Sequence, residues 1–509
     1  MTSYTHTEPF SESSKKTKRT RVFVFLLITM FMISIESTIV ATAVPEIVAE
    51  LGNFSAYSWV FSAFLLMQSV TTPIYGKLSD LFGRKPVFLI GTAIFLVGSL
   101  LCGLATSMGL LIFYRFIQGI GAGAVMPIAT TLVGDLYSLE ERSKIQGYLS
   151  SVWGISSVVG PLAGGLIVQY VSWAWVFWVN IPLGIASLIG IQLYLHEKVE
   201  KKKPSIDYLG ASLFSISISA LMLILIEGGS NWGWISKPTI SLFFVFAITL
   251  IFFLWWETRA TSPMMPLSLW KNKLIAVANV STLLAGASMI GLASFLPTYV
   301  QGIMGSSALV AGFALTAMSV GWPIAASATA KLFSRIGFRY TAILGGIFLI
   351  LGSLFFITLD PNKGPIWAGI GSFVIGVGMG FATSTFTISI QSSVGWEMRG
   401  VATASSMFMR SVGTTLGTAI LGGVLNLQLK NYLDQHHASN LKLSSIDAAN
   451  ILLDPIKKGQ LSEKALHLLQ NGLQTALHTV FWGVGVFAVL TFLSTLYFPS
   501  LQKEKQPES

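Results

Sequence analysis

Charged residues are scarce in this sequence. Only 11% of its 509 residues are Asp, Glu, Lys or Arg, whereas 53% are hydrophobic. Water-soluble domains carry about 25% charged residues, which they need to cover a surface that faces water. The composition therefore excludes an ordinary soluble protein and indicates an integral membrane protein.

Cysteine and histidine are also rare. Cys102 is the single cysteine, so an intramolecular disulfide is excluded, and its position in an apolar run indicates a small packing residue. The neighbours His436 and His437 are too isolated to form a metal site. We therefore expect no metal and no cofactor.

Common enzyme signatures are missing. The sequence contains no HExxH, no GxSxG with His and acid partners, and no Walker lysine. Gly119, Gly121 and Gly123 lie inside an apolar run and follow no expected strand, so they do not form a dinucleotide loop. Small residues at this spacing serve close helix packing. A membrane enzyme is therefore disfavoured, whereas a sensor or receptor remains open.

Long apolar runs dominate what is present. A helix crosses the hydrocarbon core with about 20 apolar residues, and recurring runs of that length favour helices over a barrel. We predict an all-α membrane protein with fourteen transmembrane helices. The expected spans are residues 22–44, 57–75, 87–106, 109–133, 147–170, 174–195, 208–227, 238–256, 274–299, 309–330, 341–359, 365–390, 401–425 and 475–497.

Loop charges predict the orientation. Lys and Arg gather in alternate loops, which the positive-inside rule assigns to the cytoplasm, so the net charge of +10 requires no nucleic-acid partner. Residues 1–21 and 501–509 are expected to be cytoplasmic tails. The apolar run after the Lys15–Arg21 cluster is too long for a signal peptide. Residues 426–471 are predicted to form a long outer loop, whose amphipathic part could lie on the outer surface or touch a partner.

The second half of the chain repeats features of the first. Ala330–Arg339 echoes Gly76–Lys85 without its acid, and glycines at 376, 378 and 380 echo the earlier glycine triplet. We therefore predict two six-helix bundles, residues 22–196 and 267–500. A basic hinge and two inserted helices, residues 197–266, lie between them. Such repeats suit two bundles that rock around a midplane site.

The stretch Gly76–Pro86 connects two expected spans and carries glycines, bases and one acid. Gly76 and Gly83 permit a tight turn, and Asp80 is expected to form an ion pair or to cap a helix. Judged by its charges alone, the stretch could simply set the topology. It resembles the loop 2–3 signature of the major facilitator superfamily. The resemblance implies that Asp80 and Arg84 belong to a charge network that gates one closed state of a transporter.

Glu36 lies deep in the first expected span, about 22 Å from Arg21. Such a charge is costly and usually faces an internal cavity. It could carry protons, bind a cationic substrate, or form half of a structural ion pair; a permanent clamp by a cation, or a lipid-facing position, would exclude the proton role. The stretch resembles the first-helix signature of the fourteen-span drug:proton antiporters of the EmrB/QacA type. That signature has aspartate here and asparagine at Ala41.

Arg115 reaches a similar depth in the fourth expected span. An arginine stays charged there and needs partners, and Gln118 lies on the same helix face three residues later. The surrounding pattern, which includes Gly119, resembles the fourth-helix signature of the superfamily. This resemblance implies a role in proton transfer; the alternative is a static polar anchor.

The fifth expected span contains Gly154, Gly160, Pro161, Gly164 and Gly165. The proline interrupts the helical hydrogen bonds and the glycines allow bending and close contact. The residues alone therefore predict a kinked packing face. The stretch resembles the fifth-helix motif of antiporters, and this resemblance implies export.

Two further polar residues are candidates for a cavity. Asn180 belongs to a stretch that resembles the family's WRW…NxPxG pattern, with Ala174 in place of the arginine. Arg410 lies in the thirteenth expected span, where the repeat places Trp153, and it could line a cavity or pair with an acid.

These patterns together predict a proton-coupled exporter of diverse lipophilic, often cationic compounds in a bacterial cell membrane. The alternative is a dedicated exporter of one metabolite or antibiotic. The expected partners are small-molecule substrates, protons and the lipid bilayer, and we expect a monomer.

Overall fold

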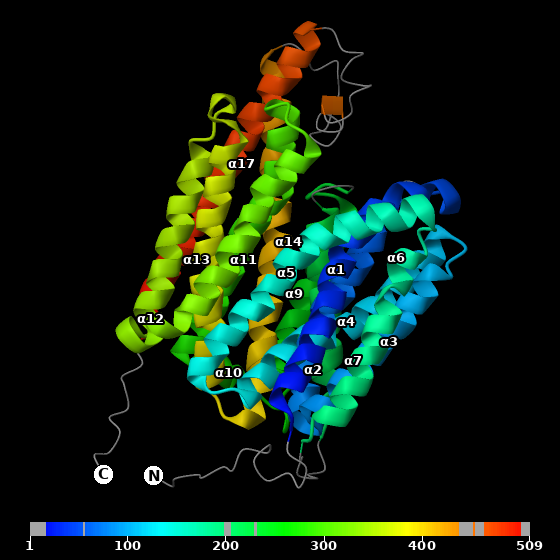
Figure 1. Ribbon diagram of the computed structural model, residues 1–509, viewed down its shortest axis with the longest axis vertical. Coiled ribbons are helices and arrows are strands. Elements are labelled where there is room, and N and C mark those ends of the chain that lie inside the picture. The colour runs from blue at the N-terminus through cyan, green and yellow to red at the C-terminus, as the bar shows by residue number, and fades with distance from the viewer. Residues whose placement is uncertain are drawn as a thin grey trace. The chain divides into compact units, whose positions relative to one another are not determined.

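The computed structural model describes residues 17–53, 56, 58–197, 205–228, 232–436, 451–452 and 463–499. The regular structure of these residues is helical throughout, with no strand (Figure 1). Most of the expected N-terminal tail, the hinge residues 198–204, most of the expected outer loop with His437, and the C-terminal tail lie outside the described residues.

The helices follow the order of the expected spans. They are α1 (Arg19–Leu51), α2 (Ser58–Phe82), α3 (Arg84–Gly103), α4 (Met108–Leu136), α5 (Leu139–Tyr170), α6 (Trp175–Trp178), α7 (Asn180–Tyr194), α8 (Tyr208–Glu227), α9 (Lys237–Glu257), α10 (Leu267–Lys271), α11 (Lys273–Thr298), η2 (Tyr299–Ile303), α12 (Ala308–Ile357), η3 (Pro361–Lys363), α13 (Gly364–Ser392), α14 (Trp396–Gln435) and α17 (Glu463–Leu496).

Thirteen helical segments within the described ranges are long and apolar enough to cross a membrane. The helix α12 supplies two of them, Leu309–Thr329 and Lys331–Ile357, and its backbone leaves the helical conformation at Gly337. The other expected span corresponds to α2, which is a continuous helix. Gln68, Thr71 and Thr72 place polar side chains in the middle of α2.

The predicted outer loop, residues 426–471, is partly helical. The helix α14 continues to Gln435, and α17 already begins at Glu463. Leu429 and Leu469 explain this difference, because both are buried in one apolar cluster of the second unit described below. The amphipathic pattern near residue 463 thus forms the start of α17 and turns leucine inward.

The chain divides into two compact units. The first comprises Met1–Leu223, Ile240–Ala276 and Thr387–Phe408; the second comprises Ile224–Thr239, Val277–Phe386 and Met409–Ser509. The end of α13 and the start of α14 therefore belong to the first unit, although they come from the second half of the sequence. The predicted bundle boundaries around residues 197–266 remain a prediction.

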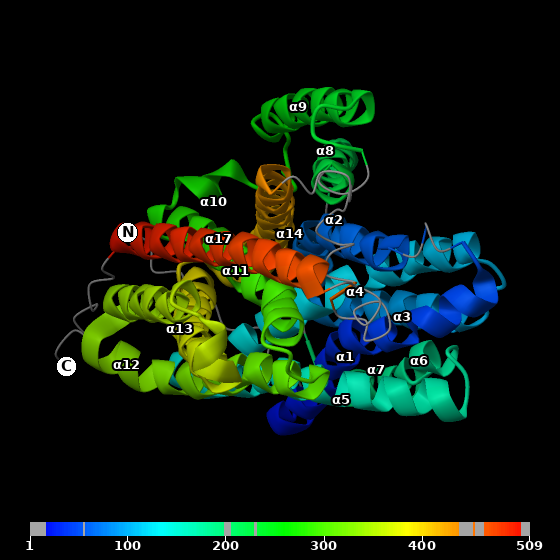
Figure 2. The same cartoon turned by 90° about the horizontal axis from the view of Figure 1, so that it is seen from above.

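In the first unit, α4 packs against both α2 and α3, and these three helices lie side by side in Figure 2. A Cβ atom on Gly119 would lie 2.5 Å from the carbonyl oxygen of Phe64 in α2. One on Gly121 would lie 2.2 Å from the backbone nitrogen of Phe95 in α3. Only glycine allows the backbones to come this close.

The second unit uses its own glycine triplet in an equivalent way. A Cβ atom on Gly376 would lie 2.2 Å from the carbonyl oxygen of Met318 in the first part of α12. One on Gly378 would lie 2.8 Å from the backbone nitrogen of Leu349 in the second part. The two parts of α12 thus contact α13 as α2 and α3 contact α4.

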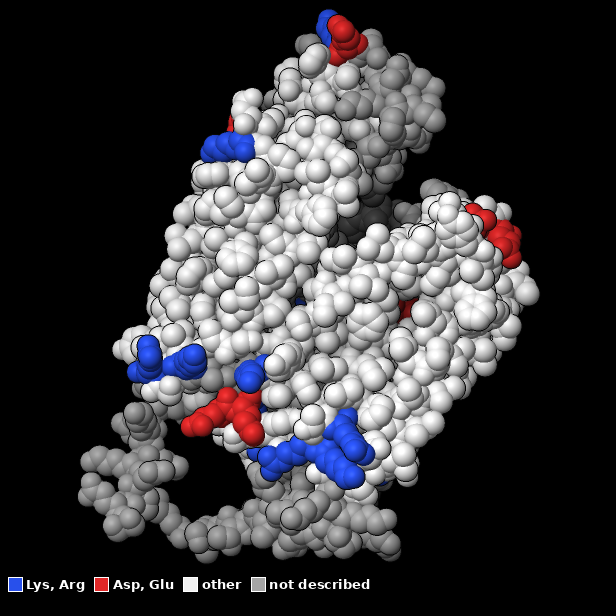
Figure 3. Space-filling model, in the orientation of Figure 1, with Lys and Arg blue, Asp and Glu red and all other residues white. Residues whose placement is uncertain are grey.

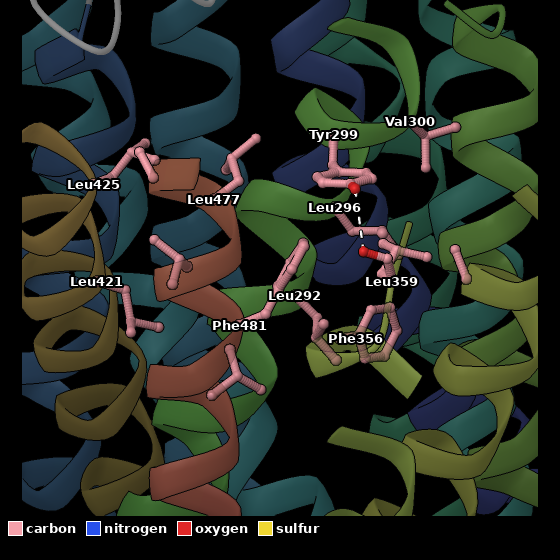
Figure 4. Close-up of a cluster of buried hydrophobic side chains, with 14 of the residues drawn as sticks. Leu292, Leu296, Tyr299, Val300, Phe356, Leu359, Leu421, Leu425, Leu477 and Phe481 are labelled. Carbon is pink, nitrogen blue, oxygen red and sulfur yellow. Dashed lines mark hydrogen bonds between the residues drawn. The ribbon is translucent and has the colours of Figure 1, made fainter. Parts of the chain in front are cut away.

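An apolar core fills the second unit between η2, α12, α14 and α17 (Figure 4). The rings of Tyr299 and Phe481 lie 5.6 Å apart, and the ring of Phe356 lies 5.7 Å from that of Phe481. The hydroxyl of Tyr299 donates to the carbonyl oxygen of Leu359 at 3.2 Å. This bond satisfies a buried polar group within the core.

The outer sides of the helices are apolar. In Figure 3 the visible sides are almost entirely free of charge, and Lys, Arg, Asp and Glu gather near helix ends. On α9, Phe243, Phe244, Ile251 and Phe252 are all exposed. A helix that is hydrophobic on all sides is typical of a membrane span.

Candidate functional site

Glu36 is the centre of a buried polar cluster in the first unit. Its side chain in α1 is fully buried. Arg115 from α4 forms an ion pair with Oε1 of this carboxylate. Asn180, at the start of α7, donates its Nδ2 hydrogen to Oε2 at 2.5 Å. Both carboxylate oxygens therefore have a partner.

The guanidinium of Arg115 is held by several groups besides Glu36. Its Nε donates to the carbonyl oxygen of Val60 at 2.8 Å, and its Nη1 donates to Oε1 of Gln118 at 2.7 Å. The guanidinium also lies 4.3 Å from the ring centre of Phe64. These contacts fix the planar side chain in one orientation, which a lysine could not reproduce.

Ser99 in α3 closes the cluster. Its Oγ accepts hydrogen bonds from Gln118 and from Asn180, each at 3.2 Å, and donates to the carbonyl oxygen of Phe177 at 2.8 Å. The sequence analysis missed Ser99, because a lone serine in an apolar helix carries no distinguishing pattern. The Oδ1 atom of Asn180 has no hydrogen-bond partner among the described residues.

In this conformation Glu36 neither faces lipid nor offers a free oxygen to a ligand. The arrangement is that of an ion pair, one of the three interpretations that the sequence left open. A role in carrying protons or in binding a cation therefore requires that Arg115 and Glu36 separate during the working cycle. Leaving either charge buried alone would be strongly unfavourable, so any separation must be coupled to new partners, water or a proton.

The predicted antiporter motif packs α5 against α1 next to Glu36. A Cβ atom on Gly160 would lie 2.0 Å from the hydroxyl oxygen of Thr38, and one on Gly164 would lie 2.1 Å from that of Thr42. The hydroxyl of Thr38 also donates to the carbonyl oxygen of Ser156 at 3.1 Å. The backbones therefore approach closely, and the two helices are joined within two residues of the carboxylate.

The other members of the motif have different surroundings. Pro161 lies inside α5, and a side chain on Gly165 would meet open space. The carbonyl oxygen of Gly154 accepts a hydrogen bond from the hydroxyl of Ser157 at 2.8 Å. Close contact with α1 thus depends on Gly160 and Gly164.

A second cluster surrounds the turn between α2 and α3. Asp80 and Arg84 form an ion pair at 2.6 Å, as expected for an acid among bases. The carboxylate of Asp80 also accepts hydrogen bonds from the backbone nitrogens of Gly400 at 2.9 Å and Val401 at 2.7 Å. A Cβ atom on Gly76 would lie 2.4 Å from that of Ala404. The start of α14 is therefore bound directly to this turn.

Arg84 connects the turn to α4 and again to α14. Its Nε lies 3.3 Å from Oδ2 of Asp135, and its Nη2 donates to the carbonyl oxygen of Trp396 at 2.7 Å. Its guanidinium lies 4.3 Å from the ring centre of Trp396. Asp135 in turn pairs with Arg399 at 2.5 Å. We call Asp80, Arg84, Asp135 and Arg399 the charge network.

Sequence reasoning found only part of this network. Asp135 stands at the end of an apolar run and Arg399 stands between two expected spans, where charges are common and carry no distinguishing pattern. The geometry of Gly83, with φ of 95°, allows the turn that brings Arg84 inward. Burial raises the pKa of Asp80 to about 6, although the charge of Arg84 opposes this shift.

Glu197 anchors the other side of the turn. Its carboxylate accepts hydrogen bonds from the backbone nitrogens of Arg84 and Lys85, each at 2.9 Å, and thereby caps the start of α3. Burial raises the pKa of Glu197, while the two hydrogen bonds oppose this shift. The sequence analysis missed this residue because nothing in the hinge sequence marks it as a helix cap.

Arg410 lies in α14 within the second unit. Its side chain is half-buried, and it has no ion pair or hydrogen bond within the part of the chain that the structure describes. Asn180, the other predicted cavity residue, instead belongs to the cluster around Glu36. The two predicted cavity residues thus belong to different units, and a shared cavity remains a prediction.

The chain is similar to known transporters along most of its length. A family model described as the Major Facilitator Superfamily matches residues 26–418. Multidrug resistance protein 3 of Bacillus subtilis (strain 168) is 36% identical over 491 residues, which cover 95% of this chain and 96% of the relative. Multidrug transporter protein MdtP of the same strain is 33% identical over 514 residues, which cover 97% and 95%.

Solved structures with the same fold confirm the all-α class. The human organic anion transporter MFSD10 (TETRAN) matches with a TM-score of 0.63 and 14% identity, over 94% of this chain and 100% of that chain. The proton:xylose symporter XylE matches with a TM-score of 0.61 and 12% identity, over 94% and 96%. At such low identity the likeness shows the fold alone.

Proposed function

Because the chain belongs to the Major Facilitator Superfamily, and is therefore a multi-pass membrane transporter of small molecules rather than an enzyme, we propose that it exports diverse lipophilic, often cationic compounds in exchange for protons. Two full-length relatives are named as multidrug proteins, which supports the broad substrate range. The resemblance of the α5 glycine motif to that of antiporters supports the direction. We place the protein in a bacterial cytoplasmic membrane, as a monomer with both termini inside.

The observation that carries the proton coupling is a fully buried carboxylate paired with arginine in a membrane span. While Arg115 contacts Glu36, the negative charge of an ionised carboxylate is compensated. When the pair opens, an isolated carboxylate in an apolar environment binds a proton rather than remaining charged. When Arg115 returns, its charge favours release of that proton. Opening and closing of the pair would thus take up one proton and release it.

The charge network would control access to the cytoplasm. It holds the start of α14 against the α2–α3 turn through Asp80, Arg84, Asp135 and Arg399. Burying four charges together is favourable only while each keeps its partners. We propose that the network forms in one end state of the cycle and breaks in the other, so that access alternates between the two faces.

Substitution of Glu36 by glutamine tests the coupling. The neutral amide keeps the size of the side chain but cannot exchange a proton. We expect Glu36→Gln protein, reconstituted in liposomes, to lose substrate-dependent proton movement completely. Ser37→Ala, on the same helix, removes an exposed hydroxyl without a change in charge, and it serves as the matched control that should retain proton movement. Normal proton-driven export by Glu36→Gln would exclude Glu36 as the carrier.

A dedicated exporter of one metabolite or antibiotic is the second candidate. A relative from Aspergillus aculeatus, named as an acurin A biosynthesis cluster transporter, is 31% identical over 80% of this chain and 74% of its own length. A growth-inhibition panel in a pump-deleted host distinguishes the two functions. Resistance to several unrelated compounds supports multidrug export, whereas resistance to a single compound class supports the dedicated exporter.

A further inference from the structure

Arg410 is a membrane charge that the proposed proton cycle does not use. It lies in α14, about 21 Å along the helix from Trp396 at 1.5 Å per residue. An arginine at such a depth stays ionised, and buried arginines in membrane proteins pair with acids or line a polar cavity. A cation at this position therefore indicates a function that offsets its cost.

The direction of the side chain follows from its helix face. Gly413 and Gly417 lie three and seven residues after Arg410, and so on the same face of α14. A Cβ atom on Gly413 would lie 2.0 Å from the carbonyl oxygen of Leu283, and one on Gly417 would lie 2.7 Å from Cα of Ala287. This face is therefore the one that packs on α11. Arg410 points along a helix–helix contact rather than toward lipid.

The position opposite Arg410 on α11 is also a glycine. A Cβ atom on Gly286 would lie 3.4 Å from Cγ of Arg410 and 2.9 Å from its carbonyl oxygen. The absence of a side chain at Gly286 lets the backbone of α11 approach Arg410 this closely. The close contact between the backbones of α11 and α14 also fixes the position of the first carbon atoms of the Arg410 side chain.

The guanidinium of Arg410 differs from the one at Arg115 in its partners. Arg115 donates to Glu36, to Gln118 and to a backbone carbonyl. For Arg410, the described residues supply neither an ion pair nor a hydrogen bond. Its planar fork of five N–H donors is thus available to a ligand.

We infer that Arg410 binds an oxyanion carried by the transported molecule, such as the carboxylate of an amphiphilic acid. The inference deepens the proposed export function, and it extends the substrate class from cations to acids and zwitterions. A carboxylate matches the guanidinium fork with two parallel hydrogen bonds. Leu283 of α11 lies against Gly413, about one turn further along α14, and its apolar side chain suits the hydrophobic body of such a molecule.

Two dyes that differ in one group test this inference. We would measure binding of a rhodamine with a free benzoate carboxylate, and of the methyl ester of the same dye, to the purified full-length protein by fluorescence anisotropy. For Arg410→Gln, we expect affinity for the acid to fall about tenfold or more, because a charge-assisted bond is lost. Affinity for the ester should stay within about twofold, since the ester has no charge for Arg410 to bind.

Two more variants serve as controls. Arg335→Gln removes an exposed arginine of the same unit and should change neither affinity. Arg410→Lys should bind the acid with intermediate affinity, because it keeps the charge but not the fork. Equal melting temperatures of all variants would show that they are folded.

Three results would overturn the inference: equal loss of both dyes in Arg410→Gln, unchanged affinity for the acid, or no preference of the wild type for the acid over the ester. Binding is measured at equilibrium and without transport. A failure of the wild type to export any compound from cells would therefore overturn the proposed function and leave the binding result as it stands.

Discussion

The turn between α2 and α3 and the turn inside α12 have similar backbone conformations but different side-chain contacts. Gly83 and Gly337 have φ angles of 95° and 79°, which side chains rarely adopt. Lys85 then donates to the carbonyl oxygen of Leu195 at 2.8 Å, and Arg339 donates to that of Leu496 at 3.1 Å. In both repeats, a base after the glycine thus ties the turn to the residues that end a later helix.

Between these shared features the two turns diverge. Asp80 and Arg84 form a buried ion pair in the first. Ser334 and Phe338 stand at the equivalent positions of the second, where the ring of Phe338 lies 4.3 Å from that of Phe333. The hydroxyl of Ser334 donates within its own helix, to the carbonyl oxygen of Lys331 at 2.9 Å. The glycine and the last base are thus common to both turns. The acid–arginine pair is specific to the first turn, where Arg84 also contacts Asp135 and Trp396.

Among changes in the two turns, removal of Asp80 should reduce export the most. Asp80→Ala leaves Arg84 without its nearest acid and two backbone nitrogens of α14 without their acceptor. Breaking a buried pair in this way costs roughly 3–5 kcal/mol. We expect dye export from cells to fall to the level of an empty vector at equal amounts of protein in the membrane.

Ser334→Ala is the matched control for Asp80→Ala. It removes an exposed hydroxyl at the equivalent position, and we expect export to stay within about twofold of the wild type. Equal losses in both variants would contradict the distinction between the two turns.

Replacement of Arg84 by lysine should have a smaller effect. Lysine keeps the charge but cannot contact Asp80, Asp135 and the carbonyl of Trp396 together. We expect the initial export rate in proteoliposomes to fall about tenfold, since one charge-assisted hydrogen bond is lost. Arg339→Lys, at the base of the second turn, should retain the rate, and a rate for Arg84→Lys that also matches the wild type would show that a point charge is sufficient.

Alanine at Gly83 or at Gly337 should have the smallest effect, and the loss of stability should be similar at the two positions. Gly83→Ala and Gly337→Ala both force a side chain into an unfavourable backbone conformation, at a cost of about 1–3 kcal/mol. Each variant should lower the melting temperature in detergent by a few degrees. A loss of stability in only one variant would show that the two glycines are not structurally equivalent.

Much of the fold could be predicted because its signals are local. An apolar run of about 20 residues predicts a membrane helix wherever it lies in the chain, so the order of the helices follows from the sequence alone. The ends of α14 and α17 were harder to predict, because Leu429 and Leu469 are scattered among polar residues. Their burial depends on a partner surface that only the folded chain supplies.

The site was predictable only where a residue is unusual for its surroundings. Glu36 and Arg115 stand out because charges in apolar runs are expensive. Ser99, Asp135 and Glu197 carry no such mark, since serines in helices and acids at helix ends are common. Their roles arise from chain segments far apart in sequence, which no spacing rule connects.

The contact between α1 and α5 limits how these helices can move. Thr38 and Thr42 each fill a hollow left by a glycine, and both pairs are spaced by four residues, or about one helical turn. A slide of part of a turn would drive hydroxyls into backbone, whereas a full turn of about 5.4 Å would set Thr38 into the next notch. The contact therefore favours displacements of whole turns, and smaller shifts of Glu36 along α5 are expected to be disfavoured.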